Sequence, residues 1–143
     1  MLLNLLAIIK SYAVFLQALT ETQVIIKPSA VKSEKFHVEL NLLPHPVIVG
    51  NGRARLRLRA TVCAEIPASD KAIDDCLQKS LVLAQFFDAA QGFTIKKGVY
   101  GMAYHSILRD DDDLFADLEA EERSFSYNES WLVELEFNTN EFI

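Results

Sequence analysis

The segment from Arg53 to Ala64 constrains the fold most strongly, because basic or polar residues alternate along it with apolar ones. Side chains of a β-strand point alternately to opposite faces, whereas a helix cannot separate two classes of residue with a period of two. We therefore predict a long strand with one apolar and one basic face. The apolar face consists of Ala54, Leu56, Leu58, Ala60, Val62 and Ala64, and the basic face of Arg53, Arg55, Arg57 and Arg59.

Other segments also have the character of strands. The residues from Pro44 to Gly52 form a loop or β-arm, in which the pair Asn51-Gly52 favours a hairpin turn. Further strands are predicted from alternation or β-branched content at Gln23–Lys27, Phe36–Leu42, Phe93–Lys97, Val99–Leu108 and Phe125–Phe137.

Apolar residues at helical spacing predict a helix over residues 2–19 and a central helix from Ser69 or Asp70 to about Ala90. Residues 114–122 are predicted to form a short helix, and residues 138–143 a loose tail. The expected core positions are Leu2, Leu5, Leu6, Ile9, Tyr12, Ala13, Leu16 and Leu19 in the first helix, and Ile73, Cys76, Leu77, Leu81, Ala84 and Phe87 in the central helix, widened by Val82, Leu83 and Phe86.

The first helix is apolar on nearly all sides. A surface helix of a monomer usually has a polar back, so this helix is either buried on two sides or covered by a second chain. Lys10 lies inside the apolar run rather than before it, which argues against a signal peptide. The run is also too short and too interrupted for a membrane span, so we expect no membrane contact.

These elements predict one α+β domain over residues 1–143, with a mixed, mainly antiparallel β-sheet flanked by an N-terminal helix and one central helix. A net charge of -6 argues against nucleic-acid binding, which requires a basic surface. Cys63 and Cys76 fit neither a disulfide framework nor a zinc motif. We expect two buried thiols in a reducing cytoplasm, with a disulfide bond as the alternative.

No motif for catalysis or cofactor binding is present. The glycine patterns of nucleotide-binding loops and of serine hydrolases are missing. His37, His45 and His105 lack the spacing of a metal-binding pair, so structural roles are expected. Glu134 and Glu136 share a strand face, but nothing in the sequence places them in a catalytic pocket. We therefore predict no catalytic residue, no cofactor and no metal.

The run Asp110, Asp111, Asp112 and Asp113 has several interpretations. A solvated charge run is the simplest one. Carboxylates also suit calcium or magnesium, although the spacing is not that of an EF-hand loop. The run could instead be an acidic loop that is presented to a partner protein.

Arg53, Arg55, Arg57 and Arg59 require carboxylates, water or a partner, because like charges on one strand face repel each other. The arginines could be balanced by Glu39, Glu134 or Glu136 on neighbouring strands. Alternatively they form a subunit interface, where arginine is enriched. The chain is strongly acidic from Asp110 onward, so basic and acidic surfaces of neighbouring copies could meet head to tail and close into a ring.

The order of elements resembles that of the tail-terminator and tail-completion proteins of lambda-type phages. The shared layout is an apolar first helix, long strands with a loop rich in proline and glycine, the helix at Ser69–Ala90, and strands with an acidic insertion. The resemblance implies a hexameric ring that ends the tail tube, contacts other tail or head proteins, and resides in the host cytoplasm or the virion. Under it, the arginine face and Asp110–Asp113 are candidate ring or tube contacts.

Two other functions fit the same residues. One is a monomeric or dimeric adaptor of a prophage or secretion system, which would use the same surfaces for a different partner. The other is a metal-dependent enzyme that uses the acidic cluster Asp110–Asp113.

Overall fold

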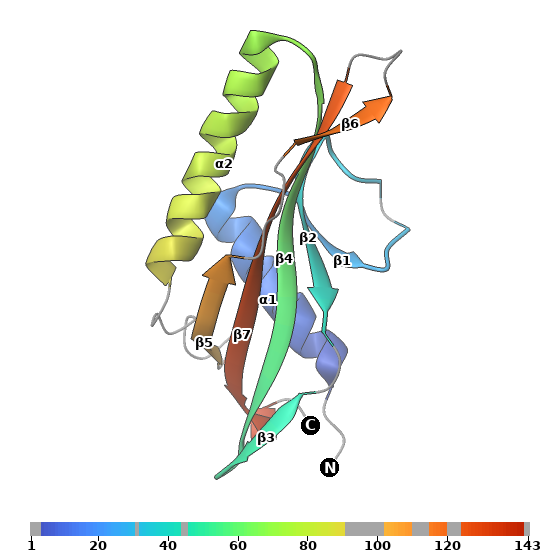
Figure 1. Ribbon diagram of the computed structural model, residues 1–143. Coiled ribbons are helices and arrows are strands. Elements are labelled where there is room, and N and C mark those ends of the chain that lie inside the picture. Colours follow the sequence, from blue (N-terminus) through green and yellow to red (C-terminus); the bar gives the residue numbers. More distant parts are fainter. Residues whose placement is uncertain are drawn as a thin grey trace.

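The computed structural model describes residues 4–30, 32–43, 46–90, 102–109, 115–119 and 124–141. Within these residues, seven strands form one sheet, and both helices pack on the same face of it (Figure 1). In chain order the elements are α1 (Leu5–Thr20), β1 (Val24–Lys27), β2 (Phe36–Leu42), β3 (Val47–Gly50), β4 (Arg53–Pro67), α2 (Asp70–Ala90), β5 (Met102–Arg109), β6 (Phe115–Glu119), β7 (Ser124–Asn138) and the 3-10 turn η1 (Thr139–Glu141).

Two long antiparallel strands, β4 and β7, form the centre of the sheet and pair from Arg53↔Asn138 to Pro67↔Ser124. The strand order is β1-β2-β4-β7-β5, with β3 paired to one end of β4 and β6 to one end of β7. Among the strands that the structure describes, only the β1–β2 pair is parallel. The predicted α+β class, with a mixed and mainly antiparallel sheet beside two helices, is confirmed.

The core lies between the helices and the apolar face of β4, which follows the predicted parity. Phe87 of α2 stacks on Trp131 of β7 with 4.5 Å between the ring centroids, and both side chains are fully buried. From α1, Tyr12 meets Tyr104 of β5 edge to face, and the Tyr104 hydroxyl donates a hydrogen bond of 3.2 Å to the Tyr12 hydroxyl. Aromatic burial of this extent is a large part of the stability of a small domain.

Both predicted long helices are present, and polar side chains mark their beginnings. The amide of Ala7 donates to Asn4 Oδ1 at 3.1 Å, and the amide of Ala72 donates to Ser69 Oγ at 3.2 Å. Such bonds satisfy amides that lack a partner in the first helical turn. The first helix ends at Glu21, whose backbone is in the left-handed region with φ 53°.

Several apolar residues that we expected in the core are exposed. Each helix buries a narrower strip than its apolar residues would allow, because only one row of side chains meets the sheet. In α2 the buried strip is Cys76, Ser80, Leu83, Ala84 and Phe87, which is rotated away from Leu77 and Leu81. The exposed residues among the predicted core positions are Leu6, Leu19, Leu77, Leu81 and Val82.

The prediction of a helix at residues 114–122 was wrong over the described part, where β6 (Phe115–Glu119) is a strand. It pairs antiparallel with β7, with Phe115 opposite Tyr127. The reason is tertiary: β5 covers this edge of β7 only from Trp131 to Phe137, so the first half of β7 needs another partner. Such pairing overrides the local helix propensity.

The prediction of a loose tail after Asn138 was also wrong for its first residues. The Thr139 side chain is 2% exposed, and its amide and hydroxyl both donate to the Gly52 carbonyl, at 2.8 and 2.9 Å. The Asn51-Gly52 turn itself has positive φ at both residues, 53° and 73°, as the sequence predicts for a tight hairpin. The predicted strand at 93–97 lies outside the described residues.

Candidate functional site

The four arginines of β4 lie on the face of the sheet that carries no helix, and β7 supplies carboxylates beside them. Glu136 is directly opposite Arg55, and Glu134 is opposite Arg57. One carboxylate serves two arginines: Arg53 Nη1 lies 3.2 Å from Glu136 Oε2, and Arg55 Nε lies 3.2 Å from Glu136 Oε1. Two of the four arginines are therefore paired inside the chain, although the single charge of Glu136 balances only one of their two charges.

The other two arginines of the row differ from each other. Arg59 is half-buried and has an interaction partner, as does Glu134. Arg57 is exposed, and no carboxylate in the part of the chain that the structure describes forms an ion pair with it. Arg57 is thus the member of the row that is best placed to meet a second molecule.

The acidic candidates Asp110, Asp111, Asp112 and Asp113 lie outside the described residues. The preceding residue, Arg109, ends β5 and turns toward the sheet. Its Nη2 lies 3.1 Å from Glu129 Oε2 on β7.

Glu129 is a charged residue on the buried face of the sheet, only 5% exposed. The Tyr127 hydroxyl donates to its Oε2 at 2.8 Å, and the guanidinium of Arg109 lies over the Trp131 ring at 5.3 Å from its centroid. Burial is the main cause of the raised pKa of Tyr127, and the neighbouring carboxylate of Glu129 adds to it. This cluster ties the end of β5 to β7 beneath α2, which is a structural role.

The β3 strand exposes three consecutive apolar side chains. Val47, Ile48 and Val49 are 52%, 56% and 45% exposed. Within the described part of the chain, β3 pairs only with the first residues of β4, and it projects at the end of the sheet opposite to β6 (Figure 1). Consecutive exposed apolar residues on an edge strand are unusual, because such strands pair readily with other chains.

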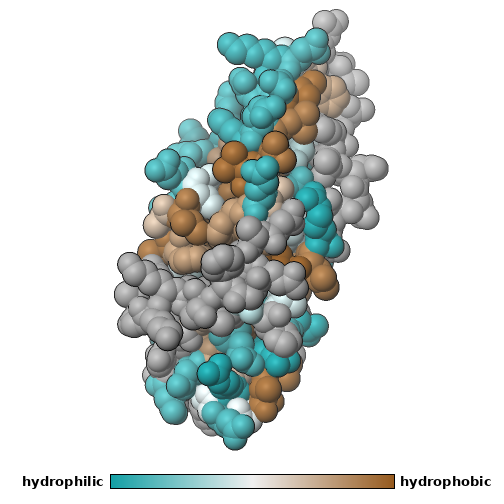
Figure 2. All heavy atoms as spheres, turned by 90° about the vertical axis from the view of Figure 1, so that its left-hand side faces the viewer, coloured by the Kyte–Doolittle hydropathy of each residue, from teal (hydrophilic) through white to brown (hydrophobic). Residues whose placement is uncertain are grey.

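The outer surfaces of the helices add further apolar area. Val14 of α1 is 58% exposed and Val82 of α2 is 65% exposed. Figure 2 shows the side of the molecule on which α2 lies, where apolar residues stand among hydrophilic ones. Apolar surface that is repeated over several elements is typical of proteins that contact other proteins.

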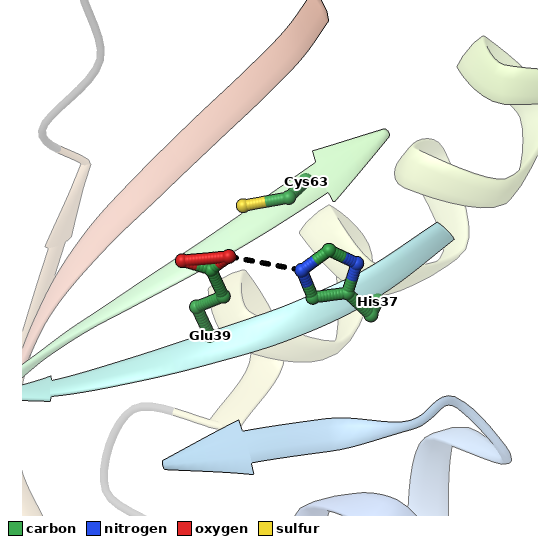
Figure 3. A group of neighbouring side chains, drawn as sticks. All are labelled: His37, Glu39 and Cys63. Carbon is green, nitrogen blue, oxygen red and sulfur yellow. Dashed lines mark hydrogen bonds and ion pairs between the residues drawn. The ribbon is translucent and has the colours of Figure 1, made fainter. Parts of the chain in front are cut away.

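A separate cluster lies on the helix-free face, where β2 and β4 run side by side. His37 and Glu39 belong to β2, and Cys63 belongs to β4 opposite His37 (Figure 3). Nε2 of His37 lies 2.9 Å from Oε2 of Glu39, and Nδ1 lies 2.8 Å from the carbonyl oxygen of Glu34. The three side chains point toward one another, with the imidazole facing the carboxylate.

This cluster does not have the properties of a cysteine nucleophile. Burial, followed by the charge of Glu39, raises the pKa of the Cys63 thiol to about 12. The reactive form of cysteine is the thiolate, and reactive cysteines have a lowered pKa. A pairing of Cys63 with His37 for nucleophilic catalysis is therefore disfavoured.

Spacing along the chain does not reveal this cluster. His37 and Cys63 are 26 positions apart and come together through the strand register. One signal in the sequence was usable. Both residues stand at alternate positions of their strands that point away from the core, opposite to the apolar positions. The register itself, which depends on the pairing of β2 with β4, is not visible in the sequence.

No protein family matches the chain, and no curated protein matches it either. Within the described residues, neither helix has the length and apolar content that crossing a membrane would require.

Proposed function

We propose that this chain is a structural protein of a phage or prophage tail, a ring-forming tail terminator or tail-completion protein. It acts through contacts with copies of itself and with other tail or head proteins, and not by catalysis. The observation that carries the proposal is the apolar arm, Val47–Val49 of β3, which a single copy leaves exposed.

The physical reason is the cost of leaving such a strand uncovered. Natural proteins protect edge strands with charged residues, proline or a covering segment. Val47–Val49 carries no charge, and burying apolar surface contributes about 25 cal/mol for each Å² removed from water. A neighbouring copy that covers the arm supplies this gain and removes the risk of uncontrolled pairing.

A complementary surface exists elsewhere on the same chain. Between α1 and β1 lies a hollow of about 420 Å³, lined by Leu6, Val24, Ile25 and Ile26 together with polar residues. Among the described residues β1 pairs only with β2. The Val24 amide on its outer edge donates to Gln17 Oε1 at 3.2 Å, and the rest of that edge is open to another strand. An extended apolar arm from a neighbour fits both the hollow and the edge.

The arm and the hollow are different surfaces, so the contact between copies is head to tail. Contacts of this kind close into a ring when the rotation between neighbours permits it. The pairing of Arg53 and Arg55 with Glu136 makes charge a smaller contribution to this contact than the sequence suggested. Arg57 and Asp110–Asp113 remain candidates for contacts with the tail tube or the head.

Light scattering and electron microscopy of the purified chain test the proposal. We expect a closed ring, six-membered by the resemblance to tail terminators, and loss of the ring in Ile48→Lys. Leu108→Lys is the matched control, because Leu108 is 60% exposed on β5, at the other side of the sheet from β3. The second half of the test adds the ring to a polymerising tail-tube protein, whose growth should stop.

A monomer at high concentration would contradict the proposal and favour an adaptor with a different partner. If the ring forms but tube growth continues, the proposed assembly stands and the terminator role is rejected. Asp110–Asp113 lie outside the described residues, so the structure adds no support for a metal-dependent enzyme that uses them.

A further inference from the structure

Three side chains of different ligand types converge on the helix-free face, far from the β3 arm. The possible ligand atoms of His37, Glu39 and Cys63 all lie within 4.8 Å of one another. A tetrahedral zinc ion with Zn–N near 2.0 Å and Zn–S near 2.3 Å holds its ligand atoms about 3.5 Å apart. Small side-chain rotations would therefore bring all three atoms to one ion.

The hydrogen bonding of His37 prepares it for such a role. The Glu34 carbonyl oxygen can only accept, so His37 Nδ1 must carry the proton of the 2.8 Å bond between them. Metal-binding histidines usually donate their second ring N–H to a carbonyl or carboxylate in this way. This bond fixes the ring with Nε2 directed at Glu39.

The contact between Nε2 and the carboxylate also requires a cation. In the neutral ring with a proton on Nδ1, Nε2 is an acceptor, and so is Oε2 of Glu39. Two acceptors cannot face each other at 2.9 Å unless a proton lies between them. A zinc ion that replaces this proton holds the two atoms slightly farther apart, at the separation of tetrahedral ligands. A proton needs only these two atoms. The sulfur of Cys63 adds a third ligand, of a type that zinc prefers.

We propose that His37 Nε2, the Glu39 carboxylate and Cys63 Sγ together bind one zinc ion or a similar borderline divalent cation. The mixture of nitrogen, sulfur and oxygen ligands selects zinc over calcium or magnesium. A hollow of about 350 Å³ beside the three residues leaves room for water as the fourth ligand. On binding, the ion displaces the thiol proton and the proton shared by Nε2 and Oε2, and both protons are released to water.

The bound ion would act as a clip. It joins β2 to β4, and through the bond from His37 to Glu34 it also fixes the segment that precedes β2. One competitor is present: Lys27 Nζ lies 3.9 Å from Glu39 Oε2 and opposes a second positive charge there. The clip does not depend on the β3 arm, so it can be tested whatever the assembly state.

Titration with Co²⁺, followed by absorption spectroscopy, tests the site because Co²⁺ replaces zinc and reports a thiolate ligand by a charge-transfer band. We expect one ion per chain, a band that disappears in Cys63→Ala, and bleaching of the band when Zn²⁺ is added. Cys76→Ala is the matched control, since this second cysteine lies on the buried side of α2 and its loss should leave the band unchanged. Lys27→Met should tighten binding a few-fold.

Glu39→Gln keeps the sulfur and should retain the band, with affinity at least about tenfold weaker, because loss of a ligand costs no less than loss of an outer-shell partner. Wild-type protein that binds Co²⁺ without a thiolate band would overturn the proposal, since exposed carboxylates alone then hold the ion. A band that persists in Cys63→Ala, or an affinity that His37→Gln leaves unchanged, would overturn it as well. The wild-type and Glu39→Gln spectra decide the question even if Cys63→Ala does not fold.

Discussion

Arg55 of β4 and Glu136 of β7 lie directly opposite each other, with 3.2 Å between Nε and Oε1. The same carboxylate also binds Arg53, at 3.2 Å through its other oxygen. A row of arginines that repel one another thus becomes a cross-strand network within a single chain. Charge should therefore contribute less to the contact between copies than the apolar arm of β3 does. The strength of the arginine network can be tested directly.

Glu136→Gln should lower the free energy of unfolding by less than about 1 kcal/mol, because exposed ion pairs contribute little. The effect should shrink further at 0.5 M NaCl or a similar ionic strength, where surface charges are screened. Urea unfolding at low and high salt measures both. Arg57→Gln is the control and should be close to neutral. If Glu136→Gln dissociated the ring without unfolding the chain, the arginine row would belong to the interface after all.

The pair of buried Glu129 and exposed Arg109 should behave differently from the surface network. Arg109→Met leaves the Glu129 carboxylate buried with the Tyr127 hydroxyl as its remaining donor, and should cost about 2 kcal/mol. Arg109→Met combined with Glu129→Leu should cost less than the sum of the two single changes, because the double variant leaves no unpaired buried charge. Urea unfolding of the four proteins measures the coupling. Additive costs would show that the pair is not coupled.

Much of the fold could be predicted because its elements have strong local signals. The alternation in Arg53–Ala64 indicates a strand and its buried face, and Asn51-Gly52 indicates the hairpin turn. The cap Ser69 marks the start of the central helix, whereas the helix that we predicted from residue 2 begins at Leu5, after the cap Asn4. These signals lie within a few residues of one another, where backbone geometry alone connects sequence to structure.

What could not be predicted depends on contacts between distant residues. The strand β6 forms because β5 leaves half of β7 unpaired, and no local signal at Phe115–Glu119 reports this. The exposure of Leu77 and Leu81 depends on how α2 is rotated against the sheet. The cluster of His37, Glu39 and Cys63 depends on the register between β2 and β4. A shift of this register by one residue would separate its members.

The buried tyrosine pair should make the protein sensitive to alkaline pH. Burial raises the pKa of Tyr104 and of Tyr12 above 10.0, the value of an exposed tyrosine. Above pH 10 the unfolded chain therefore loses protons that the native protein keeps, so the free energy of unfolding falls as pH rises. The slope approaches about 1.4 kcal/mol per pH unit for each tyrosine, and the contribution is constant below about pH 9.

Urea unfolding between pH 8 and pH 11 measures this slope. The double variant Tyr12→Phe, Tyr104→Phe should show a smaller loss of stability above pH 10, because the ionising hydroxyls are gone. Tyr127 should account for part of the remaining slope, since its pKa is raised too. Equal slopes in the wild type and the double variant would mean that these hydroxyls are exposed to water.

The head-to-tail contact makes a prediction that a symmetric contact does not. Ile48→Lys damages the arm but leaves the hollow between α1 and β1 intact, whereas Leu6→Glu damages the hollow but leaves the arm intact. Each variant alone should be monomeric.

A mixture of the two should give one-to-one dimers and no ring, because the arm of Leu6→Glu can enter the hollow of Ile48→Lys, while the opposite contact is lost. Native mass spectrometry resolves these species by mass. A mixture that stays monomeric would show that the arm binds its own counterpart or another surface, and a mixture that forms rings would show that neither residue lies in the contact.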